Sequence, residues 1–387
     1  MNGRFDALRN RALAAGAAAL ALALAGALFD APQFFRSYLV AYLFWIGFPL
    51  GSLALLMLHH LVGGRWGFVI QRLLEAAART FPLMALLFLP LVFGLGRLYV
   101  WAAPEAVAAD PVLRQKSAYL NPGFFLARAA VYFALWILFG HLLAKWSREQ
   151  DRTGDAALTG RMQNLSAPGL VVYGLTVTFA AIDWAMSLEP RWYSTIYGMM
   201  FMVGYGLAAL ALAVVGARLL AEREPLARAA VPDRFHDLGN LLLALVMLWA
   251  YLGFSQFLLV WSENLREEIP WYVSRTAGGW QAVAALLIVF QFALPFFLLL
   301  SRSAKRRARV LALIALVVLA MRWVDILWLV APAFHPGRFY LHWLDLAALV
   351  GVGGAWLGVF LFFLGESSLL PLGDPRFAGL GGEAEGT

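Results

Sequence analysis

Apolar residues fill long stretches of this chain, and short clusters of charged residues separate them. The stretches reach about eighteen residues or more, which is enough for a helix to cross a hydrocarbon core of about 30 Å. The two-residue alternation of a barrel strand is absent, so helices are the structure left to satisfy the backbone polar groups in lipid. The pattern therefore predicts an all-α polytopic membrane protein.

The pattern predicts about ten transmembrane helices, an even number that puts both termini on the same side. Their approximate bounds are 10–29, 38–62, 81–101, 124–145, 166–187, 195–219, 237–262, 278–301, 309–332 and 343–364. The first stretch follows three arginines, as in a signal peptide, but its apolar part is long for one. Residues 29–33 also do not form a small-x-small cleavage site. We predict that this stretch is retained as the first helix.

The positive charges are unevenly divided between the two sides. Twenty of the 30 Lys and Arg residues lie on the side of the termini and eight on the other, with Arg128 and Arg322 inside spans. Because cytoplasmic loops carry the excess of Lys and Arg, both termini are expected in the cytoplasm. The distribution of the positive charges therefore indicates the membrane topology. The net charge of +7 is not read as a sign of a nucleic-acid partner.

Composition narrows the chemistry further. The chain is 62% hydrophobic and 14% charged, whereas a soluble domain has about 25% charged residues. It has no cysteine, which excludes disulfides, thiolate zinc sites and cysteine-ligated iron–sulfur clusters within the chain. The six histidines fall near one surface or the other, and only His60 with His141 is left open as a haem pair. We expect no haem and no metal site, so a quinone would be the only electron carrier.

A short pattern recurs along the chain. Ile182-Asp183 is followed by Pro190 seven residues after the aspartate, and Val324-Asp325 is followed in the same way by Pro332. The two copies lie at the ends of the fifth and the ninth helix, which are four spans apart and so have the same orientation. Helices 2–5 and 6–9 are therefore either parallel four-helix repeats or only coincidentally alike. The division expected is a flanking helix (1–37), two bundles (38–194 and 195–342), and a second flanking helix with a tail disordered after Pro371 (343–387).

Ionisable residues inside the spans are the candidate functional groups, because burying an unpaired charge is expensive. Asp183 lies near the outer end of helix 5 and is either part of a structural ion pair or a proton acceptor. Arg128 either reaches the outer interface or pairs with Asp183. Arg322 and Asp325 are three residues apart and share a helix face, so they either neutralise each other or form a proton relay in which Arg322 tunes Asp325.

Histidines mark the inner side of the same helices. His141 lies about a turn from the inner end of helix 4, His236 opens helix 7, and His59 and His60 end helix 2. Such interfacial histidines are either simply solvated or serve as proton entry points, since histidine titrates near neutrality. His141 and His236 are our proton-path candidates on this side.

Aromatic residues gather towards the outer face. An aromatic belt is common to membrane proteins, so the clustering does not by itself indicate a ligand. Trp184, Trp192 and Tyr193 are the quinone-binding candidates because they flank Asp183 in sequence. The acidic segment 263–268 makes the outer surface between helices 7 and 8 a candidate docking surface.

Several stretches together carry a resemblance to a known family. They are Leu56 to Gly67, Tyr119-Leu120-Asn121 with Phe124-Phe125 and Arg128, Trp146-Ser147 with Gln150-Asp151 and Gly154-Asp155, Thr178 to Gly198, Phe235 to Gly239, Trp249-Ala250-Tyr251, Phe254-Ser255-Gln256 and Trp261. On these residues the chain resembles the NrfD/PsrC-like integral membrane subunits, specifically the second such subunit (ActF type) of bacterial alternative complex III, a quinol:cytochrome c oxidoreductase.

The resemblance implies two four-helix bundles with a flanking helix at each end, in a bacterial inner membrane. It implies as partners a sister NrfD-like membrane subunit, an iron–sulfur subunit, haem c subunits and a terminal oxidase. The family's quinol site is best supported in the sister subunit. For this chain a menaquinone or ubiquinone site, a proton path and a structural anchor all stay open, and no catalytic residue is assigned. The alternatives are the anchor of a polysulfide- or nitrite-reductase-type complex, a secondary transporter, or a purely structural scaffold.

Overall fold

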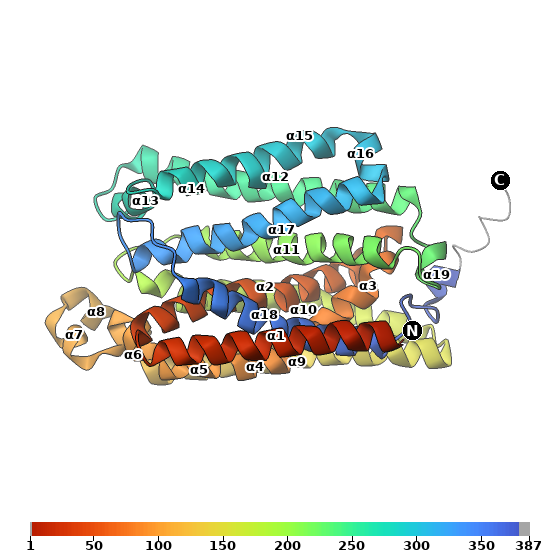
Figure 1. Cartoon of the computed structure of the whole chain (residues 1–387), viewed down its shortest axis with the longest axis horizontal. Coiled ribbons are helices and arrows are strands. Elements are labelled where there is room, and N and C mark those ends of the chain that lie inside the picture. Colours follow the sequence, from red (N-terminus) through yellow and green to blue (C-terminus); the bar gives the residue numbers. More distant parts are fainter. Residues whose placement is uncertain (1, 379–387) are drawn as a thin grey trace.

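A computed structural model of the chain describes residues 2–378, with side chains from residue 5 to residue 377. Over this part the chain consists of helices and connecting loops. Ten of its helical segments are long and apolar enough to cross a membrane, and they run side by side along the long axis of the molecule (Figure 1). The chain is therefore an all-α, multi-pass membrane protein, as predicted.

The ten spans are single helices or short series of helices. They are α1 (Asn2–Ala27), α2 (Ala31–Val62), α3, α4 and α5 (Arg65–Ala78, Phe81–Leu87, Leu89–Phe93), α9 (Pro122–Thr153), α10 (Ala157–Trp184), α11 (Tyr197–Leu220), α12 (Pro232–Glu263), α14, η4 and α15 (Trp280–Leu287, Ile288–Ala293, Leu294–Leu300), α17 (Ala308–Val330) and α18 (Trp343–Gly365). The connections include α6 (Leu95–Leu98), η1 (Val100–Ala102), α7 (Pro104–Ala109), α8 (Pro111–Lys116), η2 (Met186–Leu188), η3 (Leu226–Arg228), α13 (Ile269–Arg275), α16 (Arg302–Arg306), η5 (Ala331–Ala333) and α19 (Pro375–Ala378).

Local sequence explains where α9 begins and ends. The Asn121 side chain accepts a hydrogen bond from the Phe124 backbone N–H, and Pro122 takes the first helical position, where no N–H is needed. At the other end Gly154 adopts a left-handed conformation with φ of 66°, and its N–H donates to the Gln150 carbonyl. These two caps fix a helix of 32 residues. At about 1.5 Å per residue it is longer than the hydrocarbon core, so its ends extend beyond the core.

The third span begins much earlier than predicted. The sequence placed it at 81–101 and treated Arg65, Arg72 and Arg79 as loop residues, but helix α3 starts at Arg65 and only Gly63 and Gly64 separate it from α2. The prediction was wrong because it searched for an unbroken apolar run. Helix α3 carries charged side chains and still buries almost its whole length, Arg72 included. The polar part of this span therefore lies inside the bundle.

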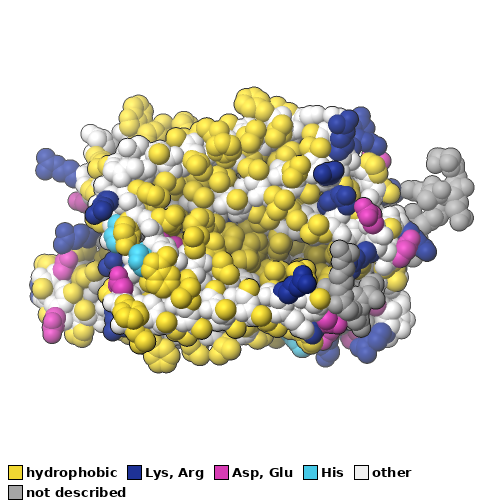
Figure 2. All heavy atoms as spheres, viewed as in Figure 1, with side chains coloured by type: hydrophobic (Ala, Val, Ile, Leu, Met, Phe, Trp, Pro, Cys, Tyr) yellow, Lys and Arg dark blue, Asp and Glu magenta, His cyan; other side chains and the backbone are white. Residues whose placement is uncertain are grey.

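Charged residues mark the two ends of the membrane-spanning body. On α9, twenty residues separate Arg128 from Arg148, which corresponds to about 30 Å of helix and matches the hydrocarbon thickness. In Figure 2 the ionised side chains gather at the two ends and apolar side chains cover the surface between them. We call the end at which α9 ends, with Arg148, the basic end, and the end at which α9 begins, with Arg128, the opposite end. The cytoplasmic location of the basic end stays a prediction.

The central eight spans pack in two groups with the same order of neighbours. In the first, α2 packs on α3 and α10, while α9 packs on α10 and on α3 and α4. In the second, α11 packs on α12 and α17, while the α14–α15 span packs on α17 and α12. Helices α2 and α11 form the main contact between the groups. Helices α1 and α18 pack on each other and on α2, so both flanking helices lie beside the first group (Figure 1).

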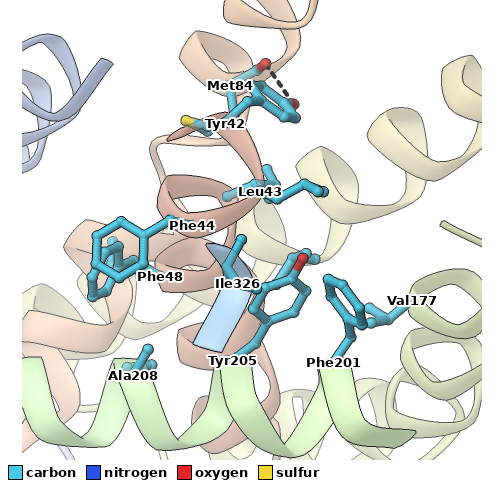
Figure 3. Close-up of a cluster of buried hydrophobic side chains, with 14 of the residues drawn as sticks. Tyr42, Leu43, Phe44, Phe48, Met84, Val177, Phe201, Tyr205, Ala208 and Ile326 are labelled. Carbon is cyan, nitrogen blue, oxygen red and sulfur yellow. Dashed lines mark hydrogen bonds between the residues drawn. The ribbon is translucent and has the colours of Figure 1, made fainter. Parts of the chain in front are cut away.

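The contact between the two groups is a dense apolar core. Figure 3 shows Tyr205 of α11 next to side chains of α2, α10 and α17, with the Tyr42 hydroxyl donating to the Met84 carbonyl at 3.0 Å. The backbones of α2 and α11 approach closely because Gly51 has no side chain: a Cβ there would lie 1.9 Å from the Tyr205 carbonyl oxygen. Small residues at such crossings are the usual means of helix association in membranes.

The segment after Pro371 is only partly as expected. The sequence predicted disorder from there to the end, but Asp374 is buried, Arg376 pairs with it at 2.8 Å, and the Gly373 N–H donates to Asp151 of α9 at 3.1 Å. Residues 371–378 therefore pack on the basic end, and disorder is wrong for them. They are held by backbone and ionic contacts that a Gly- and Pro-rich composition does not reveal. Residues 379–387 lie outside the described part of the chain.

Candidate functional site

Asp183 is completely buried in the last turn of α10. Its two carboxylate oxygens accept hydrogen bonds from Arg128 of α9, from Nη2 at 2.8 Å and from Nε at 2.9 Å. The Tyr132 hydroxyl, one turn further along α9, donates to the same carboxylate at 2.9 Å. Of the two alternatives for Arg128, the structure selects the pair with Asp183. A carboxylate held on both oxygens by a guanidinium accepts a proton only if those contacts rearrange.

Arg128 in turn is held in place by contacts with residues at the opposite end of the molecule. Its Nη1 donates to the Tyr119 carbonyl at 3.0 Å, and its guanidinium lies 3.8 Å from the Tyr119 ring centre and 4.3 Å from that of Phe124. Burial raises the pKa of the Tyr119 phenol above its ordinary value. The ion pair is thus covered by aromatic rings, and Arg128 connects the buried Asp183 with the surface loop that contains Tyr119.

Asp325 is the second buried carboxylate, on α17 in the other group of helices. It accepts hydrogen bonds from Arg322 one turn earlier and from Trp249 Nε1 of α12, the latter at 3.0 Å. Gly204 of α11 makes room for the guanidinium, because a Cβ there would lie 2.3 Å from Arg322 Nη2. Both carboxylates lie in the half of their helix nearer the opposite end. The first is paired between helices and the second within one helix.

Some of the buried polar atoms without partners lie in the second group. Arg322 Nε, Trp323 Nε1 and both polar atoms of the Gln291 side chain have no hydrogen-bond partner within the described chain. Gln291 lies in η4, a π-helical turn, and such turns are frequent at functional sites. Buried polar groups of this kind normally bind water or a ligand. The sequence analysis missed Gln291, although one glutamine inside an apolar span was a visible signal.

A third buried pair was also missed. Arg275 of α13 pairs with Glu189 at 2.6 Å and donates to the Leu329 carbonyl of α17 at 2.8 Å. Its guanidinium lies 3.8 Å from the Trp271 ring centre. The sequence analysis counted Arg275 as an ordinary loop cation, and nothing local marked it as buried. It joins the turn after α10 to the end of α17.

The three quinone-binding candidates lie in three different environments. Trp184 is buried among aromatic rings of the first group, such as Phe133 at 5.9 Å. Trp192 is buried too, but stacks on Trp271 at 4.5 Å and 11°. Tyr193 is exposed. The structure does not bring these side chains together around one cavity.

The histidines are placed differently from one another. His141 is exposed, and His236 is partly buried beside Asp237. His59 and His60 are completely buried, with no partner for any ring nitrogen within the described chain. Of the two alternatives, simple solvation is wrong for His59 and His60, because they are buried. A role in proton entry stays a prediction. His60 is thus buried and His141 exposed, and the absence of a haem stays a prediction.

A buried ionic network lies beneath the basic end. Arg72 of α3 donates to Glu75, to Asp151 of α9, and to the Ser147 hydroxyl at 3.0 Å. The sequence analysis missed this network because it placed Arg72 in a loop. The network ties α3, α9 and, through Gly373, the C-terminal segment to one another.

Comparison with known proteins adds no relative. No protein-family model matches the chain, and no curated protein sequence matches it.

Proposed function

We propose that this chain is a membrane subunit of a quinol-oxidising electron-transfer complex of the alternative complex III type. Its own task in the complex is to handle protons at the opposite end, through Asp183 and Asp325. The observation that carries the proposal is the pair of buried carboxylate–arginine contacts, one in each group of four helices, in the same half of the membrane.

Energetics support a role beyond stability. Replacing a buried ion pair by well-packed apolar residues is often neutral or stabilising, so a protein that keeps two such pairs gains little stability from them. In membrane proteins, ionisable residues inside the spans commonly mark proton or ion pathways. The resemblance set out above supports the same class of complex.

In the proposed step, the contacts between Arg128 and Asp183 rearrange, and a proton released by quinol oxidation transfers to a carboxylate oxygen of Asp183. The carboxyl group becomes neutral, and its hydrogen bonds with Arg128 weaken. Arg128 keeps its contact with the Tyr119 carbonyl, which lies in the surface loop. The proton leaves to water when the ion pair forms again, so Arg128 returns Asp183 to its charged state.

We propose that the quinone itself, menaquinone or ubiquinone, binds in the sister subunit or at its boundary with this chain. Trp184 and Trp192 pack against different aromatic rings, and Tyr193 is exposed. Electrons would then pass through iron–sulfur and haem c subunits towards an oxidase, because this chain has no cysteine. The acidic segment 263–268 is the surface offered to such a partner. Within this segment, burial and the negative charges of the neighbouring Glu263 and Glu267 raise the pKa of Glu268 above its ordinary value.

The test is to purify the full chain from its native membrane, identify the co-purifying subunits, and measure quinol oxidation and proton release. We expect iron–sulfur and haem c subunits, and lower turnover and proton release in Asp183→Asn and Asp325→Asn complexes that still assemble. Asp345→Asn is the matched control. Asp345 is another buried carboxylate at the opposite end, but it accepts from Ser37 and from the His342 backbone to cap α18. Absence of redox subunits, or equal effects of all three variants, would refute the proposal.

The alternatives predict different results. A polysulfide- or nitrite-reductase-type anchor would share the helices but co-purify with a different catalytic subunit. A secondary transporter would favour helices unwound in mid-membrane. Among the described spans, the π-helical turn Ile288–Ala293 keeps the α14–α15 span helical through its middle. In the third span, breaks of only one or two residues separate α3, α4 and α5. A structural scaffold would keep full activity in the aspartate variants once assembled.

A further inference from the structure

A recess opens at the basic end where α3, α9 and α18 meet. It is lined by Arg72, Glu75, Ala76, Arg79, Ala144, Arg148, Phe363, Leu364 and Ser367. The empty space between these side chains, its open side included, is about 230 Å³. Three arginines thus surround one small opening, and neither the carboxylate pairs nor the proposed proton chemistry uses it.

The recess lies at the level where lipid headgroups are expected. Arg148 is twenty residues from Arg128 on α9, about 30 Å along the helix, so the two arginines bracket the hydrocarbon core. Arg79 and Glu366 form an ion pair of 2.7 Å at the same junction, and Glu366 directly follows the last residue of α18. The recess therefore opens at the boundary between hydrocarbon and water.

Of the three arginines around the recess, one has no carboxylate partner within the described chain. Arg72 is paired with Glu75 and Asp151, and Arg79 with Glu366. Arg148 donates from Nε to the Ala144 carbonyl at 3.1 Å. It forms no ion pair with any carboxylate of the described chain. One positive charge is thus available to a ligand at this opening.

The other wall of the recess is apolar. Phe363 and Leu364 of α18 line it, and the neighbouring Phe362 is exposed on the outside of the same helix turn. A ligand that fits both walls carries an anionic group with an apolar chain next to it. Arginine guanidinium binds phosphate through charge-assisted hydrogen bonds, and basic pockets between transmembrane helices accept anionic lipid headgroups.

We propose that this recess is a binding site for the phosphate group of an anionic phospholipid. Arg148 donates to the phosphate oxygens, Arg79 adds a second guanidinium at the rim, and the Ser367 hydroxyl is a third donor. The acyl chains lie along Phe362 and Phe363 into the hydrocarbon. A free phosphate ion would satisfy Arg148 but leave this apolar wall unused, which is the reason to assign a lipid. The site does not depend on the function proposed above.

The test compares lipid binding by the full chain, alone or in its native assembly, after exchange into a neutral detergent. Phosphatidylglycerol and phosphatidylcholine are added separately, and binding is followed by native mass spectrometry and thermal unfolding. We expect phosphatidylglycerol to bind and stabilise the protein, and phosphatidylcholine to do so much less. Arg148→Gln should weaken phosphatidylglycerol binding about tenfold, the effect of losing one charge-assisted contact. Arg148→Lys, which keeps the charge, should recover part of the loss.

Lys145→Ala is the matched control, because Lys145 is an exposed cation one turn away on α9 and does not line the recess. It should leave binding unchanged. Equal losses in Lys145→Ala and Arg148→Gln would show a general charge effect and overturn the proposal. Equal binding of the two lipids by the unmodified chain would overturn it without any variant. If inorganic phosphate alone gave the same stabilisation and blocked phosphatidylglycerol, the site would take free phosphate, and the lipid assignment would be wrong.

Discussion

Arg275 Nη2 lies 2.6 Å from Glu189 Oε2, and this contact joins two segments that are 86 residues apart in sequence. Glu189 ends the turn after α10 in the first group of helices, while Arg275 also donates to Leu329 at the end of α17 in the second. The pair therefore holds the two groups together at the opposite end. It also places Trp271 against Trp192 in a stacked pair.

Arg275→Ala should destabilise the protein by about 2–4 kcal/mol, since it removes a buried guanidinium and takes its hydrogen bonds from the Leu329 carbonyl and the Glu189 carboxylate. The measurement is the thermal or denaturant unfolding of the detergent-purified chain. Arg191→Ala is the control, because the Arg191–Asp110 pair is exposed and its loss should not change stability measurably. A similar loss in both variants would contradict a joining role for Arg275.

The Arg128–Asp183 pair should show strong coupling. Removing one partner leaves a buried, uncompensated charge, so Asp183→Leu or Arg128→Met alone should cost about 3–5 kcal/mol. The double variant leaves no buried charge and should cost clearly less than the sum of the two. A double-mutant cycle of unfolding free energies measures this coupling. Additive single effects would mean that the two charges do not stabilise each other.

Gly204 should be intolerant of a side chain. A Cβ at this position would lie 2.3 Å from Arg322 Nη2, and Arg322 is held in place by Asp325. Gly204→Ala should therefore cost about 1–3 kcal/mol through overpacking. Gly206→Ala is a close control on the same helix, because the nearest atom to its added Cβ is 4.0 Å away, on Leu245. The prediction fails if both alanines unfold at the same temperature.

Acid should release the C-terminal segment. Burial by itself raises the pKa of Asp374, but the hydrogen bonds and charge of Arg376 outweigh it and hold the pKa below its ordinary value of about 3.8. A carboxylate with a depressed folded-state pKa stabilises the folded form above the ordinary pKa, and this contribution is lost as the pH falls through the folded-state pKa. Segment 371–378 should therefore stay packed at neutral pH and loosen below about pH 4.

Hydrogen exchange of residues 371–378 as a function of pH measures this release. Asp374→Asn should expose the segment already at neutral pH, because Arg376 then loses its ionic partner. Protection that does not change with pH or with this substitution would show that the ion pair does not hold the segment.

The sequence by itself determined that the chain is built from about ten membrane-spanning helices. Long apolar runs required helices because lipid offers the backbone no hydrogen bonds. Caps such as Asn121 and Gly154 set the ends of α9 through contacts within a few residues of sequence. Arg322 and Asp325 could be paired from their spacing alone, because residues three apart share a helix face.

The tertiary structure decided which other residues meet and which are buried. In lipid an apolar side chain is stable on either face of a helix, so the pattern does not show which face is inside. Helix α12, for example, is strongly apolar, yet only 22% of its apolar window is buried. The pairing of Arg128 with Asp183, the burial of Arg72, Arg275 and His59, and the packing of residues 371–378 all depend on contacts between distant segments. Local hydropathy carries no information about such contacts.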